Sequence, residues 1–553
     1  MATLTLVAAL VAGPVSAAVG PAAVGAVDGP PASTAGDGAT GPTAPGIESP
    51  GPVGVQAGAD EAVDARARSV GDRPDGAIES PARSADAAPP DPETDVLGWE
   101  NGYWYNESID VDQTDGLDES EMDALVGRAM ARVEYIRRLE FRRDVHVEPI
   151  SRAELAERRN GTFGFPASNQ LWEALFLFGE DTSASYGVRE ALHGNVLGYA
   201  AEEGADHIVM VTETPESPRF SEWVLVHELV HMLQHQHFDL DRSRYQRTTL
   251  DGEFGKGGLV EGEASLVDRR FRELCAGGWD CSQAPRGWGG AEFPGPSRFY
   301  WLTYQPYAAG TEYVAALRER GGWTAVDRAH EDPPETSEQF LHPEASDAPA
   351  EMAFEDLAGD GWTRRADYQR VGELGIHALF RGTVTEAGGA ADFTAGPAEG
   401  WANDGLYAYE REGQQGYVWK TRWETRENAG EFAAAYRELL GAKGGERVEP
   451  GVWVIPEGPF ADAFRVRRQG RTVTVVNAPT RAALAEIRPR AAATDDPSRS
   501  ATTAPPGATT TSTDGSTTPG RSSSMPATGR PLLYALVGLS VVLLSGVAVN
   551  RLL

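Results

Sequence analysis

The stretch W-V-L-V-H-E-L-V-H-M-L-Q-H-Q-H-F, residues 223–238, is largely apolar and contains neither proline nor glycine, which predicts a helix buried in a core. His227 and His231 stand four positions apart in it, with Glu228 directly after the first. Residues four apart lie on one face of an α-helix, about 6 Å apart along its axis, so two imidazoles can bind one metal ion. Glu228 then lies beside a water molecule on that ion and can accept its proton. The competing interpretation is two ordinary helix-face histidines satisfied by hydrogen bonds.

A zinc ion that takes part in catalysis usually has three protein ligands, so the motif requires one more. His235 lies two helical turns from His227, on the order of 12 Å away on a straight helix, and we exclude it. His237 has the spacing of the metzincin pattern H-E-x-x-H-x-x-G-x-x-H, which needs the helix to break at the glycine. This chain has Gln234 there, and glutamine favours a continuing helix. His237 stays open as the less favoured third ligand.

The other candidate lies in G-G-L-V-E-G-E-A-S-L-V-D-R-R-F, residues 257–271, which we expect to form a second buried helix that begins at its two glycines. A carboxylate inside an apolar helix is costly unless it is paired or bound to a metal, so Glu261 and Glu263 both need an explanation. The E-G-x-A stretch resembles the second motif of gluzincins, and that match puts Glu261 in the ligand position. The chain departs from the motif by lacking the preceding asparagine and by having 29 residues between His231 and Glu261. A capping or salt-bridged glutamate is the alternative.

Three blocks of sequence carry a wider resemblance: residues 227–240, the E-G-E-A of 261–264, and P-P-E-T-S-E-Q-F-L-H-P at 333–343. Together they resemble a group of haloarchaeal surface proteins with a gluzincin-like zinc metallopeptidase domain, over approximately residues 97–490. The resemblance implies a zincin fold and a zinc ion (Zn2+) bound by His227, His231 and Glu261.

The implied reaction is attack of water on a polarised carbonyl, with Glu228 as the general base and zinc stabilising the oxyanion. A second electrophile commonly helps in such reactions. His342 is our candidate because it lies in the third block, although it also fits a structural histidine that caps a turn. Tyr300, Tyr304 and Tyr307 are further candidates, which core packing explains better.

The composition excludes some partners. The formal charge of the 553 residues is −33, and of the 49 basic residues only Lys256, Lys420 and Lys443 are lysines. This charge argues against a nucleic-acid partner, because phosphate binding needs the opposite sign. Excess carboxylate with scarce lysine favours a protein that stays hydrated in concentrated salt, and an acidic secreted protein from a GC-rich organism is the alternative.

The elements before the histidine motif predict the fold class. Residues 195–200 and 207–212 have the pattern of strands, and a strand followed by a metal-binding helix is the order of the zincin fold. The edge strand of that fold can hold an extended peptide by backbone hydrogen bonds. We expect an α+β protein with a zincin-like domain, a small sheet plus a mainly helical part, over 96–358. A small α+β module follows over 359–490, and its first element is expected to be a helix over 368–381.

The ends of the chain predict export. Residues 1–18 resemble a secretory signal peptide, because a short apolar run ends in small residues. Residues 19–95 have no aromatic residue and are expected to be disordered. A stalk rich in threonine, serine and proline is expected over 491–530, followed by a transmembrane anchor over 531–550.

Two further features fit an exported chain. Cys275 and Cys281 are its two cysteines, and they predict a local disulfide. Asn106 and Asn160 begin N-glycosylation sequons. We therefore expect a membrane-anchored, cell-surface zinc hydrolase that acts on an extracellular protein or peptide. The alternative is a surface or envelope protein that uses a zincin scaffold for binding without catalysis.

Overall fold

The computed structural model describes a defined part of the chain, namely residues 7–10, 91–158, 165–166, 168–193, 196–201, 206–282, 297–344, 347–359, 361–382 and 396–489. The expected stalk and membrane anchor lie outside these residues, as do most of the expected signal peptide and most of 19–95. Among the described residues, no helix has the length and apolar character needed to cross a membrane. The fold is α+β, as expected from the sequence.

The first sheet contains both strands that the sequence predicts before the histidine motif. Its order is β1-β5-β6-β4, with bounds β1 Val7–Leu10, β4 His146–Ser151, β5 Val196–Ala201 and β6 His207–Thr212. β6 pairs in parallel with β4 and antiparallel with β5. β1 pairs antiparallel with the outer side of β5. The motif helix packs against β5 of this sheet and also contacts β1 and β6.

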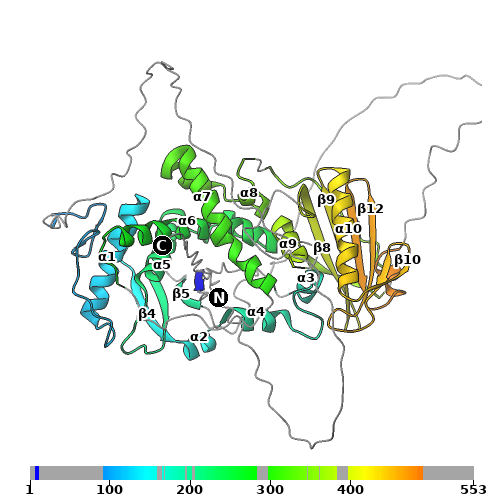
Figure 1. Cartoon of the computed structure of the whole chain (residues 1–553), viewed down its shortest axis with the longest axis horizontal. Helices are drawn as coiled ribbons and strands as arrows, with labels where there is room; N and C mark the ends of the chain where they lie inside the picture. The colour runs from blue at the N-terminus through cyan, green and yellow to red at the C-terminus, as the bar shows by residue number, and fades with distance from the viewer. Residues whose placement is uncertain are drawn as a thin grey trace, which may run out of the picture. The chain divides into compact units, whose positions relative to one another are not determined.

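The helical part is built around two long helices that pack against each other, α5 Glu222–Phe238 and α6 Leu250–Ala276 (Figure 1). Two more contact α6, namely α1 Glu119–Arg137 and the kinked α7 Ser297–Glu331. The disulfide expected between Cys275 and Cys281 is present at the end of α6.

A buried ion pair network fixes the start of α5 on α1. Glu222 lies in the first turn of α5, and its carboxylate oxygens are 3.1 Å from Arg128 NH2 and 2.6 Å from Arg132 NH1. All three side chains are buried. Breaking such a pair leaves an uncompensated buried charge, so this contact sets the position of the helix.

The expected start of the second helix, near residue 257, is wrong. α6 begins at Leu250, and the glycines inside it allow close packing rather than marking its entrance. A Cβ at Gly262 would lie 2.3 Å from the carbonyl oxygen of Gly310 in α7, and one at Gly310 would lie 2.5 Å from that of Gly258. These glycines let α6 and α7 approach backbone to backbone.

The C-terminal module is an antiparallel sheet with helices against it. Its strand order is β10-β11-β12-β13-β9-β8-β7. Figure 1 shows α10 (Arg426–Ala442) lying along strands β9 and β12, and α11 (Ala483–Ile487) packs against β13. The strands are β7 Thr363–Gln369, β8 Trp401–Arg411, β9 Gln414–Trp423, β10 Glu446–Glu449, β11 Val452–Val454, β12 Ala463–Gln469 and β13 Thr472–Ala478.

The single helix expected over 368–381 is also wrong. The segment is split into the end of β7 and α9 (Gly372–Phe380). Gly372 has φ +75°, and a Cβ there would lie 1.9 Å from Oδ1 of Asp251. The backbone N–H groups of Val371 and Gly372 both donate to the buried carboxylate of Asp404. The break therefore depends on contacts with residues far away in sequence.

Short elements complete the described fold. They are β2 Trp99–Glu100, β3 Tyr103–Trp104, α2 Arg152–Arg158, α3 Asn169–Ala174, α4 Ala184–His193, the 3-10 helix Ser243–Tyr245 and α8 Ser337–Leu341.

Candidate metal centre

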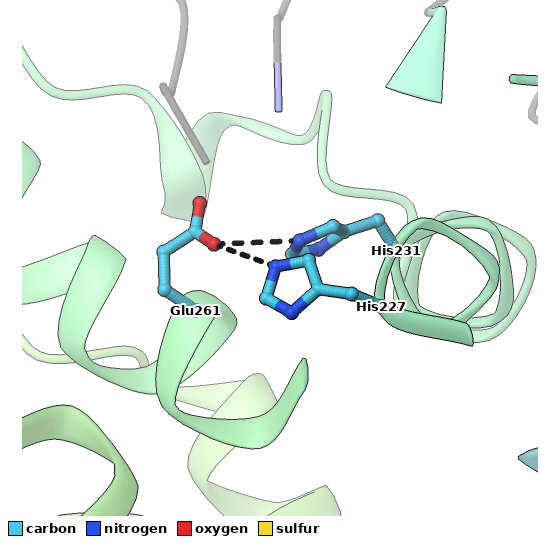
Figure 2. Close-up of side chains that lie close together, drawn as sticks. All are labelled: His227, His231 and Glu261. Carbon is cyan, nitrogen blue, oxygen red and sulfur yellow. Dashed lines mark ion pairs between the residues drawn. The ribbon is translucent and has the colours of Figure 1, made fainter. Parts of the chain in front are cut away.

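The structure brings the three predicted ligands together. His227 and His231 lie one turn apart on α5, and Glu261 faces them from α6 (Figure 2). One carboxylate oxygen, Glu261 Oε2, is 3.5 Å from Nε2 of His227 and 3.4 Å from Nε2 of His231. All three side chains are buried. Two imidazole nitrogens and one carboxylate oxygen, with ligand atoms within 4.8 Å of one another, make a three-ligand set for zinc.

Each histidine is oriented through its other ring nitrogen. Nδ1 of His227 is 3.3 Å from Oδ2 of Asp268, and Nδ1 of His231 is 2.8 Å from Oε1 of Gln234. Both partners accept hydrogen bonds, so the Nδ1 atoms carry the protons and the Nε2 atoms can act as ligands. Metal-binding histidines commonly have outer partners of this kind. The donor set therefore fits a zinc ion.

The ionisable side chains of the cluster shift one another's pKa values. Burial lowers the pKa of His227, but hydrogen bonds with Asp268 and Glu261 outweigh it and raise the value to about 9. Burial also lowers the pKa of His231, and this effect prevails. For Glu261, burial raises the pKa, but His231 and His227 bring it down to about 2. Protonation of His227 and binding of a metal ion therefore oppose each other, because a histidine ligand must be neutral.

Glu263, the second glutamate that needed an explanation, is not part of the ligand set. It forms an ion pair with Arg137, and its Oε2 is 2.6 Å from Nε2 of His330. Nε2 of Gln234 also donates to Glu263 Oε2, at 2.7 Å. These contacts hold the Glu263 pKa well below its usual range, although burial opposes them. Glu263 thus anchors Gln234, which in turn orients His231.

Glu228, the predicted general base, is buried next to the triad. A Cβ built on Gly198 of β5 would lie 3.4 Å from Cγ of Glu228, so β5 passes directly over this side chain. The Glu228 charge also raises the pKa of His227 and of Tyr307. The predicted base therefore lies between β5 and the triad.

Tyr307, which the sequence assigns to core packing, lies against the triad. Its ring is stacked on His227 with centroids 6.0 Å apart, and its hydroxyl is hydrogen-bonded to Glu261. Burial, followed by the charges of Glu261 and Glu228, raises the Tyr307 pKa well above its usual value. The side chain is thus a neutral hydroxyl that can donate a hydrogen bond.

The structure places His342, the predicted second electrophile, in another pair. Its Nε2 is 2.9 Å from Oε1 of Glu373, and this hydrogen bond raises the His342 pKa. Within the described ranges, no hydrogen bond or ion pair joins His342 to the triad. Its catalytic role stays a prediction that the geometry does not support.

The two remaining histidines of α5 point elsewhere. α5 continues unbroken to Phe238, and Nε2 of His237 is 2.7 Å from the backbone oxygen of Glu140. His235 is buried, and burial lowers its pKa to about 4. Neither belongs to the group formed by His227, His231 and Glu261.

Comparison with known proteins concerns the C-terminal module. Residues 360–488 match a Domain of unknown function (DUF8575). No curated protein and no solved structure matches the chain. The matched residues lie close to the 359–490 bounds expected for the module from the sequence. The match does not include the triad and therefore carries no information on the function of that site.

The sequence interpretation missed Asp268 and the orienting role of Gln234. Asp268 follows Glu261 by seven positions, which puts both on one face of α6. That spacing was a usable signal for Asp268. The contact of Gln234 with Glu263 has no counterpart in local sequence spacing.

Proposed function

We propose that this chain is a zinc-dependent hydrolase of the gluzincin type that cleaves peptide bonds. One observation carries the proposal: Oε2 of Glu261 lies within 3.5 Å of Nε2 of both His227 and His231. The proposal includes a zincin-like domain, which is supported by the order of β5, β6 and α5 along the chain. Zinc in such a site supplies a Lewis acid and lowers the pKa of a water molecule.

The residues around the triad have distinct roles in this proposal. Glu228 accepts a proton from the attacking water, because it is buried beside the ligands and follows His227 directly. Tyr307 donates a hydrogen bond to the developing oxyanion, because its raised pKa keeps the hydroxyl protonated. Asp268 and Gln234 hold the two imidazoles in place.

The edge of the sheet favours a peptide over other substrates. Extended backbone at Val7–Leu10 pairs antiparallel with β5, and Ala9 lies opposite Gly198. Gly198 also lies against Glu228, since a Cβ on it would be 3.4 Å from the Cγ of Glu228. Residues 7–10 belong to the expected signal peptide, and once it is removed an extended substrate peptide on this side of β5 would pass beside the general base.

We further propose that the protein acts outside the cytoplasm, as the expected signal peptide and membrane anchor imply. The Cys275–Cys281 disulfide supports an oxidising compartment. Asn106, in the first expected sequon, is exposed and fits a glycosylated surface.

Glu228→Gln tests catalysis separately from metal binding. The variant should keep one zinc ion per chain by mass spectrometry of the metal. It should lose about 100-fold or more of its cleavage rate on a fluorogenic peptide library, because the proton acceptor is gone. The exposed Glu412→Gln serves as the matched control and should keep both properties. Full activity of Glu228→Gln would refute the assigned base. Stoichiometric zinc without turnover in the unaltered protein would favour the non-catalytic binding protein.

A further inference from the structure

A second group of acidic side chains shares no residue with the zinc triad. Glu173 lies in α3, Glu180 follows that helix, and Asp462 immediately precedes β12 of the C-terminal module. One carboxylate oxygen from each lies within 4.8 Å of the other two. Glu173 and Asp462 are buried, whereas Glu180 is exposed. The group thus joins the module to the part of the chain that precedes the triad.

No basic side chain in the described part of the chain offsets the negative charge of this group. Among the described residues, no arginine, lysine or histidine forms an ion pair with Glu173, Glu180 or Asp462. Burial raises the pKa of all three carboxyls, and repulsion adds to it, from Asp462 on Glu173, from Glu180 on Asp462 and from Asp181 on Glu180. Such an arrangement is stable only if protons or a bound cation compensate the charge.

Two buried oxygens at this place also have no hydrogen-bond donor in the part of the chain that the structure describes. They are Oδ1 of Asp462 and Oδ1 of Asn477. The Asn477 amide lies against the carboxylates, since its Nδ2 is 2.6 Å from Asp462 Oδ2 and 3.2 Å from Glu173 Oε1. Rotating that amide by half a turn exchanges its oxygen and nitrogen, which brings Oδ1 into the group as a further ligand.

The backbone around the group is held in place. The N–H of Glu180 donates to the carbonyl of Pro459 at 3.1 Å, and a Cβ at Gly179 would lie 2.3 Å from that same oxygen. Phe176 packs on Phe460 with ring centroids 4.9 Å apart. The carboxylates are therefore brought together by close packing of the two segments that carry them.

We propose that Glu173, Glu180, Asp462 and Asn477 form a binding site for a hard divalent cation, most simply Ca2+, which fastens the C-terminal module to α3. All four residues offer oxygen ligands, which Ca2+ prefers. The group contains no nitrogen or sulfur ligand of the kind that zinc prefers. The site is independent of the proposed hydrolase activity.

The test is a Ca2+ titration of the full-length protein in detergent, after removal of metals and resupply of one equivalent of Zn2+. At constant ionic strength, the unaltered protein should bind one Ca2+ by calorimetry, and its Tm should rise by on the order of 5 °C. Asp462→Asn and Glu173→Gln should abolish both effects. The exposed Glu457→Gln, close to Asp462 in the chain, should retain them.

Each outcome decides the proposal without reference to the zinc site. Asp462→Asn should fold without Ca2+ at least as stably as the unaltered protein, because it removes repulsion. Absence of Ca2+ binding by the unaltered protein would overturn the site and leave shared protons as the compensating charge. Equal Ca2+ responses in Asp462→Asn and the unaltered protein would also overturn it. Loss of zinc or of peptidase activity would not affect either result.

Discussion

Oε1 of Gln234 lies 2.8 Å from Nδ1 of His231. Gln234 occupies the position where a metzincin helix would need a glycine to turn away. In this chain Gln234 continues the helix, and its side chain orients the second histidine of the motif. The same residue thus keeps His237 away from the triad and prepares His231 to act as a ligand.

Replacing Gln234 should weaken zinc binding without removing a ligand. Gln234→Leu removes the Oε1 atom that accepts the hydrogen bond from Nδ1 of His231, and zinc affinity should fall by about 10- to 100-fold in competition with a chromophoric chelator. Gln236→Leu, on the same helix but bonded to the backbone of Arg142 and Arg143, should leave the affinity unchanged. Equal affinities for both variants would contradict the role given to Gln234.

Tyr307 and His342 can be separated as candidate electrophiles. Tyr307→Phe removes the hydroxyl beside Glu261, and kcat should fall by about 100- to 1,000-fold with zinc retained. His342→Ala removes a side chain paired with Glu373, and kcat should be unchanged. Steady-state kinetics on one peptide measure kcat for both variants. A larger loss of kcat in His342→Ala than in Tyr307→Phe would show that His342 is the electrophile, as the sequence suggests.

Glu100 makes stability depend on pH. Burial, with the adjacent Glu134 carboxylate, raises its pKa from 4.5 to about 9. The folded state therefore holds a proton that the unfolded chain loses above its lower pKa, so stability falls as pH rises through this window. Glu100→Gln imitates the protonated carboxyl. Its Tm should match that of the unaltered protein at about pH 4 and exceed it increasingly toward about pH 9.

The exposed Glu157→Gln is the control for this pH series and should shift Tm equally at all pH values. A Tm advantage of Glu100→Gln that does not grow with pH would show that Glu100 is already ionised in the folded protein.

Replacing a tightly packed glycine of α6 by alanine should change the stability of the protein in the opposite direction to replacing a glycine with free space around it. Gly262→Ala places a Cβ against the backbone of Gly310 and should destabilise the protein by about 1–3 kcal/mol. Gly430→Ala in α10 meets no atom within 4 Å and should stabilise it by about 0.5–1 kcal/mol. Thermal unfolding of both variants gives the comparison. Similar effects at the two sites would contradict the close packing of α6 on α7.

Local sequence pattern was sufficient where the apolar face of an element decides its structure. The strand at 207–212 and the helix at 223–238 were predicted almost to the residue, because burial and propensity agree there. The pattern failed at Gly258, which lies inside α6 and not at its start, and at Gly372. Both glycines make close contacts with residues far away in the chain, Gly258 with Gly310 and Gly372 with Asp251.

The sequence likewise predicts some residues of the candidate site and not others. His227 and His231 follow from helix geometry, and Glu261 from its cost as a buried carboxylate together with the E-G-x-A resemblance. Tyr307 could not be chosen over His342, because only the packing of α7 brings that hydroxyl to Glu261.

The ligand set itself is tested most directly by the zinc content of Glu261→Ala and His237→Ala. The purified unaltered protein should hold one zinc ion per chain. Glu261→Ala should lose it, because one of three ligands is gone. His237→Ala should keep it, since this side chain is bonded to the backbone of Glu140. Zinc retained by Glu261→Ala and lost by His237→Ala would contradict the account.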